Sequence, residues 1–471
     1  MTKYRRVWLC ILLFMLGIVY LMYQHREASH FGGLRLLAQE ELLQTTEGKI
    51  CLENPSEIGG ILCLNGKDIA YDKASSTYYV PHCIDKKVFE AVFTASMSAC
   101  DIYLEALPAW EQLAESVQEG HLFHVWFVAE HAYAVCNMIF TGAPVMTLKS
   151  MERVSYAYGV GELALFDPDD EEVAGLSIRV SDTLLKRNAN SGTYSIKLMK
   201  KTLEEEKKLS LLGMGKNNNW KLYKVSENDG TLMRAMLASD VWNVINTDSN
   251  LQRKYQFVEL VVNNQYQGLY LLTPKWTRAF LQADDNCLLH KAEDISNEEL
   301  AVLWKFVDSM SLSRYALFLQ ITYAFKNTVE DYIILEQMME DGKSGCILLP
   351  DKLEFAFGGF NDKLNYLSWN DTSDMLLSYT DMGIEENLWR EEIFPLCSQN
   401  WKQLRLGELD TVHFLKQVQM YKDYLVRSGL AKRCVREDMF GYYFDKLEQY
   451  ITDRLEYLDA YFGEAAEGTQ R

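Results

Sequence analysis

The stretch YQFVELVVNNQYQGLYLLT, residues 255–273, indicates the kind of fold that the central part of the chain adopts. Its two halves are rich in valine, leucine and aromatic residues, which favour β-strands. Asn263-Asn264 stands between the halves, and asparagine tolerates the left-handed backbone that a tight hairpin turn requires. The stretch therefore predicts an antiparallel β-hairpin.

The residues just upstream predict a helix and a turn. In TLMRAMLASDVWNVIN, residues 231–246, Leu232, Met236 and Val241 are spaced for one face of a helix packed under the sheet.

A glycine-rich turn is predicted within LSLLGMGKNNNWKL, residues 209–222, which contains Gly213-Met214-Gly215. Glycine permits the positive φ that a turn or a phosphate cradle needs. We interpret it as a structural turn that lets Trp220 pack, with phosphate contact as the alternative.

Residues 48–150 predict a β-rich accessory domain. Asn65-Gly66 lies between two apolar runs, which is a strong signal for a hairpin. HLFHVWFVAEHAYAVCNMIFTGAPVMTL, residues 121–148, predicts two further strands that end near Gly142 and Pro144.

The second half of the chain becomes helical from about Asn297, where apolar residues recur every three or four positions. A strand pair turning at Asp341-Gly342 interrupts the helices, which resume over residues 384–463. A β-rich part followed by a helical part predicts an α+β body of two lobes. Any site is then expected in the cleft between the lobes.

The N-terminus predicts a membrane anchor. VWLCILLFMLGIVYLMY, residues 7–23, carries no charge and follows KYRR. This length is near the lower limit for a transmembrane helix, and the basic residues place the N-terminus in the cytoplasm. Residues 1–30 are therefore predicted as a cytoplasmic tail and single-pass signal-anchor of the cell membrane, residues 31–47 as a linker, and the main body as extracellular. A cleavable signal peptide is the alternative, but bulky residues follow Tyr23 where small ones are needed.

Charge and cysteines limit the choice of partner and compartment. The formal net charge of −19 makes nucleic acid an unsuitable partner, because phosphate backbones select clustered lysine and arginine. Nine cysteines lie outside the apolar run, an odd number that leaves at least one unpaired. We interpret most of them as buried thiols, and Cys51 to Cys63 as the most plausible disulfide.

Several motifs in a fixed order resemble the CotH family, spore-coat protein H-like atypical kinases. They are GTYSIKL, LSLLGMGKNNNWKLYKVSENDGTLMRAMLASDVW, YQFVELVVNNQYQGLYLLTPKW and YITDRLEYLDAY, which span residues 192–461. The resemblance implies a two-lobed, protein-kinase-like domain over residues 151–465. It also implies transfer of phosphate from ATP to protein serine residues, with ATP and Mg²⁺ or Mn²⁺ as cofactors if the protein is active and none otherwise.

The resemblance also implies roles for individual residues. The family's metal-binding stretch, PWDLD followed by FG, corresponds to LPDKLEFAFGG, residues 349–359. The two family aspartates fall on Lys352 and Glu354, which leaves Asp351 and Glu354 as candidate metal ligands. Glu330 and Asp331 are the candidates for a degenerate catalytic position, where Lys326 falls near the family's aspartate. The candidates for nucleotide binding are Lys197, Glu259 and Lys275.

Ammonium groups at two acidic positions are electrostatically unsuited to a magnesium site. The sequence therefore predicts a pseudokinase or weakly active enzyme, anchored in the membrane, with envelope or coat proteins as substrates or partners. The alternative is a cell-envelope or spore-coat scaffolding protein without nucleotide chemistry.

Overall fold

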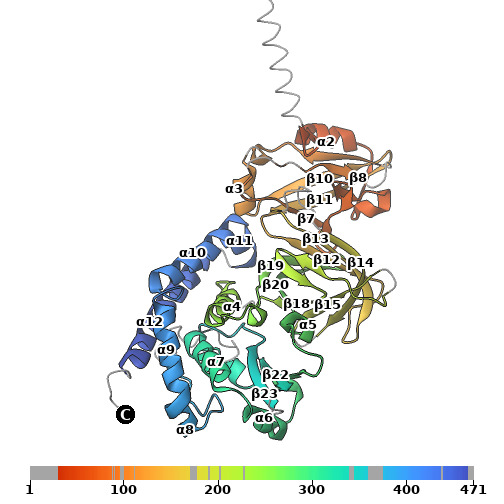
Figure 1. The fold of residues 1–471 in the computed structure, drawn as a ribbon. Helices are drawn as coiled ribbons and strands as arrows, with labels where there is room; N and C mark the ends of the chain where they lie inside the picture. The colour runs from red at the N-terminus through yellow and green to blue at the C-terminus, as the bar shows by residue number, and fades with distance from the viewer. Residues whose placement is uncertain are drawn as a thin grey trace, which may run out of the picture.

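The computed structural model describes residues 30–86, 89, 91–95, 100–110, 112–169, 178–188, 191–200, 203–225, 229–338, 344–358, 375–435 and 439–464. Three parts make up the described structure: an N-terminal sheet, a closed barrel and a helical part that contains a small sheet (Figure 1). Each part has its own cluster of buried apolar side chains.

The N-terminal part is an eight-stranded sheet with two short helices. Seven strands run in the order β1-β2-β9-β10-β11-β7-β6, and β3 also pairs with β11. The bounds are β1 His30–Phe31, β2 Leu34–Leu37, β3 Ile50–Leu52, β6 Ala70–Asp72, β7 Thr77–Pro81, β9 Asp101–Glu105, β10 Leu122–Val128, β11 Ala132–Thr141, α2 Gln39–Thr46 and α3 Leu113–Gln118. A separate sheet β5-β4-β8 is formed by β4 Leu62–Leu64, β5 Lys67–Asp68 and β8 Phe93–Ala95. The hairpin predicted at Asn65-Gly66 is confirmed, because β4 and β5 pair around it.

The central part is a closed barrel in the order β12-β13-β14-β15-β18-β20-β19. Its strands are β12 Val145–Ser150, β13 Gly159–Phe166, β14 Ile178–Arg187, β15 Tyr194–Leu198, β18 Asn219–Lys224, β19 Gln256–Val262 and β20 Gln265–Pro274. The predicted hairpin at Asn263-Asn264 is confirmed, with both residues at positive φ between β19 and β20. Parallel pairing of β12 with β19 closes the barrel.

The helical part packs below the barrel and along its side (Figure 1). Its helices are α4 Arg234–Ile245, α5 Arg278–Leu281, α6 Asn297–Trp304, α7 Ser309–Thr322, α8 Glu386–Leu388, α9 Phe394–Arg405, α10 Thr411–Arg427, α11 Leu430–Cys434 and α12 Phe440–Glu464. A small sheet is formed by β21 Leu288–Lys291, β22 Tyr332–Met338 and β23 Ser344–Pro350. The helix predicted upstream of the central hairpin is confirmed as α4, and the strand pair predicted near residue 340 is confirmed as β22 and β23.

The fold class predicted from the sequence is wrong. We expected an α+β protein with an N-terminal transmembrane helix, a small β domain and a two-lobed kinase-like domain. The structure instead mixes helices and strands around a seven-stranded closed barrel with several further sheets. The sequence signals were local hairpins, and they could not reveal the pairing of residue 145 with residue 259 that closes the barrel. The predicted domain bounds stay a prediction.

The predicted transmembrane segment lies within residues 1–29, outside the described residues. Among the helices that the structure does describe, none is both long and apolar enough to cross a bilayer.

The glycine turn is structural, as interpreted from the sequence. Leu212 and Gly213 have φ of 48° and 70° and connect two short strands, β16 Leu209–Leu211 and β17 Met214–Asn217. Trp220 then enters the barrel interior with none of its surface exposed.

The proposed Cys51 to Cys63 disulfide is wrong, because Cys51 is exposed, Cys63 is buried and both are free thiols.

His82 predicts a loss of stability at mildly acidic pH. Its side chain is 4% exposed and lies near Phe89 and Phe140. Burial lowers the pKa of His82 from 6.5 to about 4. At a pH between 4 and 6.5, the unfolded chain therefore binds more protons at this residue than the folded chain does. The folded state consequently loses stability as the pH falls from above 6.5, the pKa in the unfolded chain, toward about 4, the pKa in the folded chain. We expect this residue to make the free energy of unfolding about 2 kcal/mol lower near pH 5 than near pH 8.

Urea unfolding at both pH values measures this effect, with His82→Leu as the variant that cannot titrate. The difference in stability between the two proteins should change with pH by the stated amount. The same pH dependence in both proteins contradicts the prediction.

Candidate functional site

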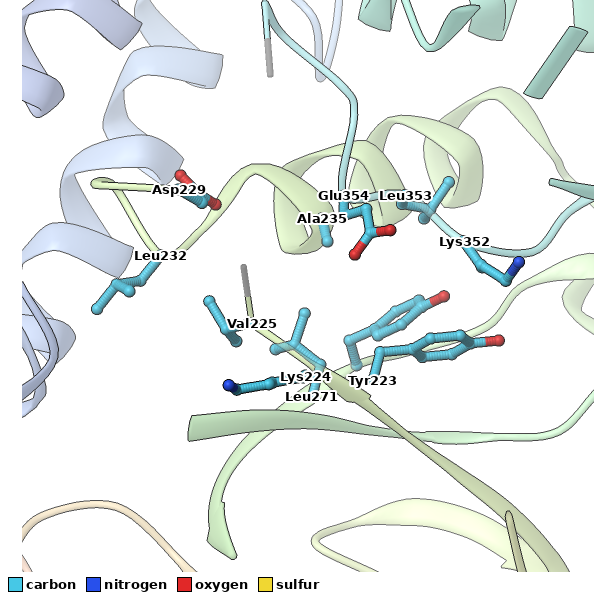
Figure 2. Close-up of a pocket in the computed structure, with 11 residues that line it drawn as sticks. Tyr223, Lys224, Val225, Asp229, Leu232, Ala235, Leu271, Lys352, Leu353 and Glu354 are labelled. Atoms are coloured by element: carbon cyan, nitrogen blue, oxygen red, sulfur yellow. The ribbon is translucent and has the colours of Figure 1, made fainter. Parts of the chain in front are cut away.

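A pocket lies between the barrel and the segment that follows β23 (Figure 2). Its walls come from β18, from the residues around the start of α4, and from the chain after Asp351. The lining residues are Tyr223, Lys224, Val225, Asp229, Leu232, Ala235, Tyr255, Leu271, Lys352, Leu353 and Glu354.

Strand alternation explains why the barrel can line a pocket on its outside. Trp220 and Leu222 on β18 point into the barrel and are fully buried there. Successive side chains of a strand point to opposite faces, so Lys221 and Tyr223 point outward. Tyr223 belongs to the apolar cluster of the helical part, which places it at the contact between the two parts.

The structure surrounds Asp351, a predicted metal ligand, with hydrogen-bond donors from the barrel. Its carboxylate accepts hydrogen bonds from Lys221 Nζ at 2.8 Å, Tyr223 OH at 2.8 Å and Arg253 Nη1 at 3.0 Å. Burial alone would raise the pKa of Asp351, but the charges of Lys221 and Arg253 outweigh burial and hold this pKa far below its usual range. The carboxylate is thus ionised and already neutralised by protein cations.

Asp331, a predicted catalytic residue, is also engaged by a lysine. Lys352 Nζ lies 2.8 Å from Asp331 Oδ1 and 3.2 Å from Glu293 Oε2. Asp331 is 3% exposed, and burial raises its pKa although Lys352 opposes this. The pKa of Lys352 is raised, because Asp331 and Glu293 together outweigh the effect of burial. A lysine ammonium therefore stands between the carboxylates.

The second predicted catalytic residue, Glu330, forms an ion pair with Lys326. Lys326 Nζ lies 2.7 Å from Glu330 Oε1 and also 5.1 Å from the centre of the Phe355 ring. Both departures from the family pattern that sequence comparison singled out, Lys326 and Lys352, are thus paired with the acidic residues nearest to them.

Glu354, the other predicted metal ligand, points toward the middle of the pocket, whereas the ammonium groups of Lys352 and Lys224 lie at its edges (Figure 2). Among the described residues it makes no hydrogen bond or ion pair. Burial raises the pKa of Glu354, and the charge of Asp331 adds to this effect. Glu354 thus reaches the pocket as a carboxylate that no lysine or arginine of the described residues binds directly.

Asp229 lines the same pocket, but its oxygens serve the start of α4. Oδ1 accepts from Thr231 Oγ1 at 2.6 Å and Oδ2 accepts from the backbone N–H of Arg234 at 3.1 Å. These bonds satisfy donors that a helix start leaves without intrahelical partners.

The structure brings two of the three predicted nucleotide-binding residues together. Lys197 on β15 is the cross-strand partner of Asn219, and the backbone N–H of Lys275 donates to the Asn219 carbonyl at 2.9 Å. Lys197 forms an ion pair with Glu206 at 2.8 Å. Burial lowers the pKa of Lys275, and its neighbours Lys221 and Lys291 lower it further.

The third, Glu259, lies elsewhere. It occurs on β19 where the barrel meets α11, with its carboxylate 2.8 Å from Arg433 Nη2 and 2.8 Å from Tyr266 OH. Tyr255, just before β19, lines the pocket, whereas Glu259 lies four residues further along the chain and is not among the lining residues. Glu259 therefore serves the contact between the barrel and the C-terminal helices.

Sequence reasoning missed Arg253, Tyr255 and Glu293. Arg253 and Tyr255 precede β19 and reach the chain around Asp351, and Glu293 belongs to the short 3₁₀-helix η4 Ala292–Asp294. Strand alternation in NWKLYK could have shown that Lys221 and Tyr223 share a face. No local pattern indicates that Arg253 meets Asp351.

The residues present do not fit a nucleotide with its metal. Over the described part of the chain, no three or more His, Cys, Asp or Glu side chains are grouped so that they could hold a metal ion. About 20 Å³ of the pocket is open to the centre of a water molecule, which is room for roughly one or two waters. The metal site that a triphosphate needs is therefore not formed by the described residues as they stand.

Comparison with known proteins gives a further observation. A family model described as CotH kinase protein matches residues 185–314. The match runs from β14 into α7 and includes Lys197, Lys221 and Arg253, but it ends before Asp331 and Asp351. No curated protein matches the chain.

Proposed function

We propose that the protein is a CotH-family pseudokinase, or at most a weakly active phosphotransferase, and the match of residues 185–314 to the family model supports this proposal. It keeps sequence motifs of the family over residues 185–314, while Asp331 and Asp351, two of the acidic candidates for catalysis and metal binding, are engaged by lysine and arginine. ATP and Mg²⁺ or Mn²⁺ are its cofactors only if weak turnover remains.

One observation carries this proposal: Lys352 Nζ lies 2.8 Å from Asp331 and 3.2 Å from Glu293. Phosphoryl transfer depends on carboxylates that hold divalent metal against the phosphates. One ammonium group already binds both carboxylates here and cancels one of their two charges, and a divalent cation placed beside it would be repelled by that ammonium. By the family resemblance, Lys352 stands at the position of an aspartate.

Phosphate transfer can be tested directly on the purified protein. Given labelled ATP with Mg²⁺ or Mn²⁺, we expect no labelling of serine in the protein itself or in an added acceptor protein above that seen with heat-denatured protein. Robust labelling that Glu354→Ala abolishes would falsify the proposal. Glu205→Ala, which removes the partner of Lys200 in an exposed ion pair, is the matched control.

A scaffolding role without nucleotide is the second candidate, and the small volume of the pocket favours it. Thermal unfolding with millimolar ATP and metal separates the two proposals. A rise in the unfolding temperature supports a pseudokinase that retains nucleotide binding, and its absence supports scaffolding. Envelope or coat proteins as partners, and the cell-membrane localisation with the main body outside, stay predictions from the sequence.

A further inference from the structure

Asp351 is the centre of a buried polar cluster that joins two parts of the molecule. Lys221 and Tyr223 come from β18, and Arg253 and Tyr255 come from the segment that leads into β19. Asp351 directly follows β23 in the small sheet of the helical part. All five residues are buried, with exposed fractions between 2% for Arg253 and 8% for Lys221 and Tyr223. The cluster therefore belongs to the barrel on one side and to the helical part on the other.

Backbone atoms on both sides of Asp351 are held as well. Tyr255 OH donates to the Asp351 carbonyl at 3.0 Å, and Trp276 Nε1 donates to the Pro350 carbonyl at 2.9 Å. Arg253 Nη2 donates to the same Asp351 carbonyl. These donors come from the segments that enter and leave the barrel, so the end of β23 is fixed to the barrel by side chain and main chain together.

The same contacts set the width of the pocket. Tyr223 lines it from the barrel side, and Lys352 and Glu354 line it from the chain that continues from Asp351 (Figure 2). Tyr255 is also a lining residue. The two walls cannot separate while Asp351 stays bonded to Lys221, Tyr223 and Arg253. Opening the pocket therefore requires that this buried cluster come apart.

We propose that Asp351 and its barrel partners Lys221, Tyr223 and Arg253 form a clamp that holds the pocket closed, so that ligand entry is controlled by breaking this cluster. The clamp goes beyond the proposed function, because it would hold the pocket closed whether or not the protein transfers phosphate. The clamp depends on the negative charge of Asp351. Without it, Lys221 and Arg253 become two buried cations that have lost their shared anion and repel each other.

Hydrogen exchange measured by mass spectrometry on the full chain tests the clamp. In Asp351→Asn, which keeps the shape of the side chain, we expect amides within residues 344–358 and 219–225 to exchange at least about tenfold faster than in the wild type, by local opening. Peptides from β10 and β11, in the N-terminal sheet, should be unchanged.

Asp459→Asn is the matched control. Asp459 forms a 2.7 Å ion pair with Arg405 that joins α9 to α12 within the helical part. We expect its loss to speed exchange in those two helices and to leave residues 344–358 at the wild-type rate. An unchanged rate in residues 344–358 of Asp351→Asn, or a uniform increase in every peptide, overturns the clamp.

Tyr223→Phe keeps the test decisive if Asp351→Asn does not fold. It removes one hydroxyl that donates to Asp351 and accepts from Lys221, and we expect the same two segments to exchange at least about threefold faster. Exchange in the folded Tyr223→Phe protein that matches the wild type also overturns the clamp. Neither result depends on phosphate transfer, so the clamp and the pseudokinase proposal can fail separately.

Discussion

Glu259→Gln is expected to lower the free energy of unfolding by about 3–5 kcal/mol, the usual cost of removing one partner from a buried ion pair. Glu259 is 0% exposed and the side chain of Arg433 is 12% exposed. Among the described residues, Glu259 is the single acidic partner of Arg433. Glutamine can still accept a hydrogen bond from Tyr266, but it leaves the guanidinium buried without a neutralising charge.

Chemical denaturation at neutral pH measures this loss. Glu206→Gln is a suitable control, because the Lys197–Glu206 pair has the same 2.8 Å separation but side chains that are 30% and 46% exposed. Exposed pairs contribute at most about 1 kcal/mol. A loss at Glu259 no larger than at Glu206 contradicts the structural role, and would return Glu259 to the list of candidate ligand-binding residues.

Lys352→Asp is expected to convert the acidic surroundings of Lys352 into a divalent-cation site. The substitution places a carboxylate beside Asp331 and Glu293, which both lie within 3.2 Å of the present ammonium group, and near Glu354. Carboxylate oxygens are the ligands that Mg²⁺, Mn²⁺ and Ca²⁺ prefer. Without metal, the added negative charge should destabilise the protein by repulsion.

Thermal and urea unfolding with and without Mn²⁺ measure the effect. The wild type should not respond to the metal, whereas Lys352→Asp should gain about 2.7 kcal/mol when the metal is present at one hundred times its dissociation constant. Lys352→Met removes the same ion pairs without adding a ligand, and Lys200→Asp makes the same charge change at an exposed pair. Neither control should respond. If Lys352→Asp folds but Mn²⁺ does not raise its stability, the prediction that Asp331, Glu293 and the new carboxylate can bind one cation together is wrong.

Local features of the fold were predictable from the sequence. The hairpins at Asn65-Gly66 and Asn263-Asn264 and the helix α4 are confirmed, because turn chemistry and apolar spacing act over a few residues. The predicted fold class was wrong, since barrel closure joins β12 to β19 across a long stretch of chain. Parallel pairing of distant strands leaves no local pattern in the sequence.

The candidate site was predicted only in part. Comparison with the family pattern singled out Lys352 and Lys326, and the structure places both in ion pairs with acidic residues. It gave Asp351 and Glu259 as possible ligands, and both are buried and engaged by arginine. From the sequence alone, an acidic residue that binds a ligand cannot be distinguished from one that pairs with a buried arginine.

The sequence by itself determined which segments form strands and helices, and that lysine occupies a position where the related family has an acid. These properties depend on residue type and on neighbours a few positions away. Only the tertiary structure decided which acids remain available, because Arg253 reaches Asp351 and Arg433 reaches Glu259 across long stretches of chain. The physical reason is that burial and ion pairing depend on distance in space, and folding sets that distance through contacts between residues far apart in the sequence.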